Sequence, residues 1–154
     1  MKKLMMVAIS ALASFGLLAE DIYVSPTGND EENTGADQWK PLKTINAALE
    51  KLGTEGGTIY LADGTYDAEK PHATENDLGD SALILSAPIV IESLSGDPSR
   101  VTLKRDTSLG LFRAVYLNHP DAVLRNLTIS GFTATSKKAG GGVYIGSAGG
   151  LIDH

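Results

Sequence analysis

The sequence predicts an all-β solenoid, a right-handed parallel β-helix of about three to four coils. Short apolar triplets of strand-forming residues recur at 59–61, 89–91, 115–117 and 143–145, and successive triplets start 30, 26 and 28 residues apart. Glycine and proline turns separate them, and residues 54–154 carry no long stretch of 3.6-residue periodicity. A strand-rich unit that repeats at this step is typical of stacked coils rather than of a helical bundle.

The last two repeats align without a gap, as VYLNHPDAVLRN at 115–126 and VYIGSAGGLIDH at 143–154. Alternation along a strand places Val115 and Leu117 inward and Tyr116 outward. We therefore expect the triplet residues Ile59, Ile89, Val115 and Val143 to stack in one column. The other aligned apolar positions are Leu117 with Ile145, Val123 with Leu151, and Leu124 with Ile152.

Residues 1–19 have the pattern of a signal peptide. Lys2 and Lys3 precede an apolar run from Leu4 to Leu18, and Ala19 is a suitable cleavage residue. The run is short and is followed at once by charged residues, which favours export over a membrane span. We therefore expect a secreted or cell-surface protein, of bacterial type.

Residues 20–57 are expected to form an N-terminal strand, a polar loop and a capping helix. Residues 21–25 read as a strand, and 26–38 as a loop. Apolar residues then recur with helical spacing, with Thr44 as the N-cap and Gly53 after the last turn. This helix would cover the N-terminal end of the solenoid core. Its apolar face is Leu42, Ile45, Leu49 and Leu52.

Residues 58–154 are expected to form the coils, at about 83–104, 112–130 and 141–154 after a first turn near 58–66. Polar excursions interrupt them at 67–82 and 130–142, and Asn126 reads as a turn residue. The last coil is incomplete by alignment. We therefore expect an N-terminal part of a longer protein, with a C-terminal edge open to self-association.

The absence of cysteine and the negative net charge exclude or disfavour several classes of site and partner. The chain has no cysteine, which excludes a disulfide framework and a thiolate metal site. Its formal charge is −6, and it becomes more negative without Lys2 and Lys3. An acidic surface argues against nucleic acid and anionic membranes, and it disfavours an anionic polymer unless Ca²⁺ bridges the two.

Five segments of the sequence resemble known β-helix proteins. IYVSPTGND, PLKTINAA and GGTIYLADGTY are similar to the N-terminal cap and first coil of pectate-lyase-like parallel β-helix proteins. RAVYLNHPDAVLRNLTISGF and GGGVYIGSAGGLIDH are similar to early coils of large bacterial β-helix repeat proteins. The resemblance implies the fold over residues 21–154. It implies no catalytic residue, because the family's catalytic residues usually lie on middle coils.

The outward tyrosines of the triplets are the candidate binding residues. Tyr60, Tyr116 and Tyr144 would form a stripe on one face, where aromatic rings can pack on sugars, and Arg113 could meet a uronate. The alternative is a ladder of rings that only stabilises neighbouring coils. No metal ligand is assigned, since the three histidines share no ligand spacing, and no residue is assigned as catalytic.

Two acidic loops, 29–33 and 67–82, offer oxygens for Ca²⁺, although 29–33 lacks the alternating ligand spacing of a calcium loop and a solvated turn is the alternative. No cofactor is otherwise expected. The sequence favours a non-catalytic, polysaccharide-binding or adhesive β-helix. The alternative is the N-terminal part of a polysaccharide lyase or glycoside hydrolase, in which acids and bases would lie on later coils.

Overall fold

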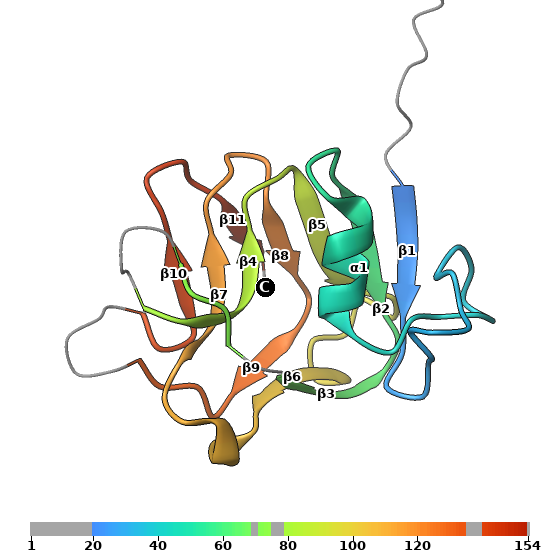
Figure 1. Cartoon of the computed structure of the whole chain (residues 1–154), viewed down its shortest axis with the longest axis horizontal. Coiled ribbons are helices and arrows are strands. Elements are labelled where there is room, and N and C mark those ends of the chain that lie inside the picture. The colour runs from blue at the N-terminus through green and yellow to red at the C-terminus, as the bar shows by residue number, and fades with distance from the viewer. Residues whose placement is uncertain (1–19, 69–70, 75–78, 135–139, 154) are drawn as a thin grey trace, which may run out of the picture.

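The protein is a parallel β-helix, as the sequence predicts. The computed structural model describes residues 20–68, 71–74, 79–134 and 140–153. The expected signal peptide lies outside these residues, as do parts of the 67–82 and 130–142 excursions. Within them, every strand pairs in parallel with a strand of a neighbouring coil, and three sheets surround one core (Figure 1).

Each of the three full coils contributes one strand to each sheet, and the first and last described strands extend sheet 1 alone. Sheet 1 contains, in spatial order, β1 (Glu20–Val24), β2 (Gly57–Leu61), β5 (Ile89–Ser93), β8 (Val123–Arg125) and β11 (Leu151–Asp153). Sheet 2 contains β3 (Gly64–Ala68), β6 (Val101–Arg105) and β9 (Thr128–Ser130). Sheet 3 contains β4 (Ser81–Leu85), β7 (Arg113–Leu117) and β10 (Val143–Ile145). A short 3-10 helix, Thr107–Leu109, connects β6 to β7.

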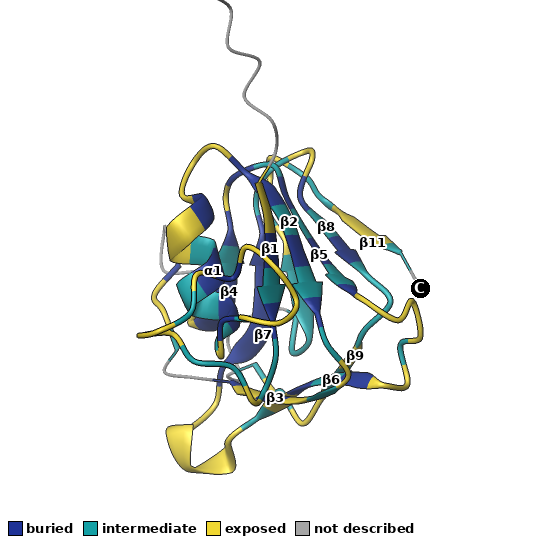
Figure 2. Ribbon diagram, turned by 90° about the vertical axis from the view of Figure 1, so that its right-hand side faces the viewer, coloured by how far each residue is buried: buried dark blue, intermediate teal, exposed yellow. Residues whose placement is uncertain are grey.

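The core of sheet 1 is a column of inward-facing aliphatic side chains. Its register places Ile22 beside Ile59, Ile59 beside Ile91, and Ile91 beside Leu124. None of these four residues is more than 2% exposed. Figure 2 shows the buried positions running through successive strands of this sheet. Stacking like residues at each coil is what allows strands of only a few residues to bury an apolar face.

The predicted capping helix is confirmed as α1 (Ile45–Leu52). Thr44 is the N-cap, and its hydroxyl accepts a hydrogen bond of 3.1 Å from the Ala47 amide. Gly53 ends the helix at a φ of 54°. The helix packs against β1, β2 and β4, and so covers the N-terminal end of the core (Figure 1). Leu42 lies before the helix, where it bridges to Val24.

The prediction that all four triplets stack in one column is wrong. Ile59 lies beside Ile91, not Ile89, so the first two triplets are offset by two residues. Val115 and Val143 lie in sheet 3, where Val115 follows Leu83. The reason is that each coil carries several similar strands, and loops of unequal length shift their spacing along the chain.

The predicted alignment of the last two repeats is confirmed. Leu117 pairs with Ile145, and Leu124 with Ile152. Asn126 forms the turn between β8 and β9 with a φ of 54°. In sheets 1 and 3 the last strands are β11 and β10, and Ile152 on β11 is 50% exposed. Self-association through this edge stays a prediction.

Candidate functional site

The outer face of sheet 3 brings three of the candidate residues together. Tyr116 and Tyr144 are neighbours in the register of β7 and β10, and their rings stack at 5.8 Å with an interplanar angle of 24°. The Arg113 guanidinium lies 4.8 Å from the centre of the Tyr144 ring, in a cation–π contact.

A bulge in β7 explains why Arg113 joins this face. The amides of Ala114 and Val115 both donate to the carbonyl of Gly142, at 2.9 and 3.1 Å, so two residues of β7 oppose one. Both side chains belong to the core, although they are adjacent in sequence. The bulge thus breaks the alternation and leaves Arg113 on the same side as Tyr116.

Much of this sheet 3 group is covered. Arg113 is 1% exposed and Tyr116 is 5% exposed, whereas Tyr144 is partly exposed. The backbone at Gly146 lies against Tyr116, because a Cβ there would come 2.7 Å from the Tyr116 hydroxyl oxygen. Tyr144 is therefore the member of the group that a ligand can reach most directly.

The expected stripe of three tyrosines does not form, because Tyr60 lies on sheet 1. Its ring stacks on Tyr23 of β1 at 5.3 Å, with an interplanar angle of 26°. Whether any of these rings contacts a sugar stays a prediction. Tyr23 was not singled out from the sequence, although Ile22-Tyr23-Val24 repeats the pattern of Ile59-Tyr60-Leu61.

The same outer column continues as a ladder of charges. Glu92 follows Tyr60 in the register, then Arg125, then Asp153. Arg125 lies 3.3 Å from the Glu92 carboxylate and 3.1 Å from that of Asp153. One guanidinium faces two carboxylates, so the ladder keeps a net negative charge while its ion pairs connect successive coils.

The loop between β1 and α1 forms a surface pocket of about 270 Å³ beside the two sheet 1 tyrosines. Trp39 lies on its rim and is 83% exposed. Its amide and that of Lys40 both donate to the Asp37 carboxylate, at 2.8 and 3.1 Å, which fixes the loop at this point. The pocket is lined by Tyr23, Val24, Ser25, Thr27, Asn33, Gln38, Trp39, Pro41, Tyr60, Ala62 and Leu94.

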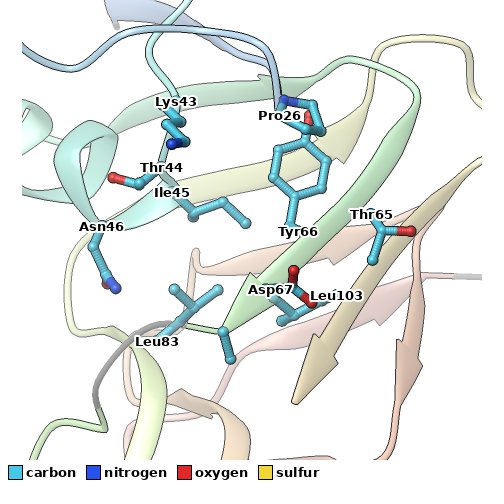
Figure 3. A pocket seen from close by; sticks show the side chains of 11 residues that line it. Pro26, Lys43, Thr44, Ile45, Asn46, Thr65, Tyr66, Asp67, Leu83 and Leu103 are labelled. Atoms are coloured by element: carbon cyan, nitrogen blue, oxygen red, sulfur yellow. The ribbon is translucent and has the colours of Figure 1, made fainter. Parts of the chain in front are cut away.

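A second pocket, of about 240 Å³, lies between the start of α1 and the junction of sheets 2 and 3. Figure 3 shows Tyr66 and Asp67 of β3 on one side of it and Ile45 and Asn46 of α1 on the other. The Tyr66 hydroxyl donates to the carbonyls of Val24 and Ala62, at 3.0 and 2.7 Å, so this ring ties β3 to the cap.

We expect the protein to lose stability at alkaline pH, because the Tyr66 phenol is buried. Burial raises its pKa well above its ordinary value, and the Asp63 carboxylate adds to this shift. The unfolded chain ionises this phenol near pH 10, whereas the fold keeps it neutral. Its contribution is therefore complete below about pH 10 and is lost as the pH rises further.

The test is urea unfolding of the wild type and Tyr66→Phe between about pH 9 and pH 11. We expect the variant to be about 1 kcal/mol less stable at neutral pH, since it loses the hydroxyl's hydrogen bonds. We also expect it to lose much of the alkaline slope. An unchanged slope would show that Tyr66 does not control this titration.

In the acidic loop 29–33, two of the oxygens considered for Ca²⁺ accept hydrogen bonds from backbone amides. Asn29 accepts from the amides of Glu31 and Glu32, at 2.9 and 3.2 Å, and Asp30 accepts from those of Lys43 and Thr44, at 2.7 and 3.1 Å. Within the described residues, no three His, Asp or Glu side chains are grouped as a metal site would need. The 67–82 loop lies partly outside them.

Comparisons with known proteins agree with the fold. Residues 26–75 match the family model described as "Protein of unknown function (DUF1565)". Over 81 residues, 53% of this chain, the sequence is 38% identical to pectate lyase PEL9 of Emericella nidulans, and the match spans 18% of that protein. The solved structure of a rhamnogalacturonan lyase superimposes with a TM-score of 0.58 at 18% identity, over 72% of this chain and 28% of that one.

Taken with the three parallel sheets, the structural likeness identifies the chain as a parallel β-helix, and over about half of its length the chain is similar in sequence to a pectate lyase. It spans less than a third of the length of either relative. None of the helices in the described part is both long and apolar enough to cross a membrane.

Proposed function

We propose that the protein binds a polysaccharide through the outer faces of its coils, as the N-terminal part of an exported protein. The similarity to pectate lyase PEL9 carries this proposal, because that relative acts on a polysaccharide and has 38% identity over 81 residues. The partly exposed Tyr60 and Tyr144 rings supply surfaces on which sugars can pack. Secretion is part of the proposal and rests on the pattern of residues 1–19.

Binding suits the described residues better than cleavage. Eliminative cleavage of a uronate needs a base at the proton beside the carboxylate and a cation that stabilises the developing charge. Among the described side chains, Arg125 is engaged by Glu92 and Asp153, and Arg113 is buried over Tyr144. Both guanidiniums are thus already engaged in contacts of the fold.

The second candidate is a polysaccharide lyase, favoured by the names of both relatives. In that case these coils would belong to an enzyme whose acid and base residues lie outside the described part. The two candidates share the polysaccharide and differ in whether this chain alone turns it over.

We expect the purified chain to bind polysaccharide without cleaving it. Affinity electrophoresis in gels that contain single polysaccharides measures binding, and ultraviolet absorbance of unsaturated uronides measures elimination. Reducing-end assays cover hydrolysis. Retardation without new chain ends is the expected result. Release of unsaturated or reducing ends would support the lyase or hydrolase instead, and no retardation by any polymer would contradict binding.

A further inference from the structure

The pocket beside Tyr23 and Tyr60 has the chemistry of a sugar site. We propose that it binds a neutral sugar residue of a polysaccharide chain, with Trp39 and Tyr60 as its aromatic contacts. This inference rests on the proposed function and names a site and a ligand class for it. The site lies on sheet 1, away from the Arg113 and Tyr144 group of sheet 3.

Three aromatic side chains line this pocket. Tyr23 and Tyr60 are held in register by the β1–β2 pairing and stack at 5.3 Å, which fixes them as one platform. Trp39 projects from the loop above and is 83% exposed. The C–H groups on a face of a pyranose ring carry partial positive charge, and the faces of aromatic rings are negative. Trp39 packs little against the rest of the chain, so a role in the core does not explain why a large aromatic residue stands at this position.

Polar groups surround the rings, as a sugar site requires. Hydroxyls of Ser25 and Thr27 line the pocket, hydrogen bonded to each other at 3.0 Å, and the amides of Asn33 and Gln38 lie beside them. The Gln38 side chain makes no hydrogen bond to any described residue, so both its donors and its acceptor are available. Mixed hydroxyl and amide groups match the hydroxyls of a sugar, which both donate and accept.

The pocket is built in advance of any ligand. The loop is fixed to β1 by hydrogen bonds from the Tyr23 amide to the Gly35 carbonyl, at 2.8 Å, and from the Leu42 amide to the Tyr23 carbonyl, at 2.9 Å. The Asn33 side chain donates to the Pro41 carbonyl at 2.8 Å. A preformed site loses less conformational entropy on binding, which favours recognition of a flexible sugar chain.

The charge around the pocket selects a neutral sugar. None of the described residues that line it carries a charged side chain. Burial raises the pKa of Tyr60, and the carboxylates of Asp21 and Glu92 raise it further, so negative charge lies close to this ring. The same carboxylates would repel the carboxylate of a uronate.

The test uses the whole chain and its intrinsic fluorescence. Trp39 is the only tryptophan in the sequence, so its emission reports on this pocket alone. The probes are neutral galactan, glucan, mannan and xylan, with polygalacturonate as the charged counterpart of galactan. We expect at least one neutral polymer to shift the emission of Trp39, to protect it from iodide quenching and to retard the chain in affinity electrophoresis.

Trp39→Ala and Tyr60→Ala should each weaken that retardation about tenfold or more. Leu111→Ala is the matched control, since this apolar side chain is 53% exposed and lies outside the pocket. Trp39→Ala should keep the wild-type circular dichroism. If polymers bind equally well to Trp39→Ala, the pocket assignment is overturned while polysaccharide binding stands. If polygalacturonate alone shifts the Trp39 emission, the preference for a neutral sugar is overturned. If no polymer binds at all, both proposals fail.

Discussion

Replacing Ile59 by alanine is expected to lower the free energy of unfolding by about 2–5 kcal/mol. Ile59 lies in the middle of the inward column of sheet 1, between Ile22 and Ile91, and none of the three is exposed to solvent. Neighbouring coils hold the strands at a fixed spacing, so the cavity cannot collapse. Domains of this size are typically stable by about 5–15 kcal/mol, so the loss is a large fraction of the total.

Ile152→Ala is the matched control, because it removes the same atoms from the same column one position beyond Leu124. Ile152 is 50% exposed, so we expect its replacement to cost less than about 1 kcal/mol. Urea unfolding of both variants, followed by circular dichroism, measures the difference. Equal losses would mean that the column is not the centre of the core.

The capping helix was predictable because its signals are local. Thr44, the apolar spacing and Gly53 act within one short segment, so no knowledge of the rest of the chain is needed. The register of the last two coils was predictable for a related reason. Val115 to Val143 and Val123 to Leu151 span the same number of residues, so one alignment fits both sheets.

The assignment of strands to sheets was not predictable from the triplets. A triplet such as Ile89-Val90-Ile91 in sheet 1 has the same pattern as Val115-Tyr116-Leu117 in sheet 3. The excursions between strands differ in length, so distance along the chain does not identify the sheet. For this reason the predicted stripe of Tyr60, Tyr116 and Tyr144 was wrong.

The bulge at Ala114 and Val115 and the pocket beside Trp39 depend on contacts between distant segments. The bulge requires two amides to converge on the Gly142 carbonyl, and nothing in the local sequence specifies this. Trp39 could have been suspected, as a lone tryptophan in a polar loop. Its partner ring, Tyr60, comes from another coil and is placed only by the β1–β2 register.

Gly57→Ala should detach the N-terminal cap from the first full coil. A Cβ at this position would lie 2.3 Å from the Glu20 carbonyl oxygen of β1 and 2.8 Å from the Leu52 side chain of α1. The backbone there has a φ of 149°, a region that side chains other than glycine rarely adopt. Either β1 and α1 move away from β2, or the strand changes conformation. We expect the free energy of unfolding to fall by about 3 kcal/mol or more.

Gly96→Ala is the control, because it introduces backbone strain at a positive φ without the steric clash expected at Gly57. Gly96 also has a positive φ, of 71°, but a Cβ there meets no atom within 4 Å, so we expect a cost of only about 1–2 kcal/mol. Amide hydrogen exchange identifies the segment affected. In Gly57→Ala, amides of β1 and α1 should exchange faster, while those of β5 change less, because the clash lies between the cap and β2. Equal destabilisation by the two substitutions, with β1 still protected, would show that close packing at Gly57 does not hold the cap.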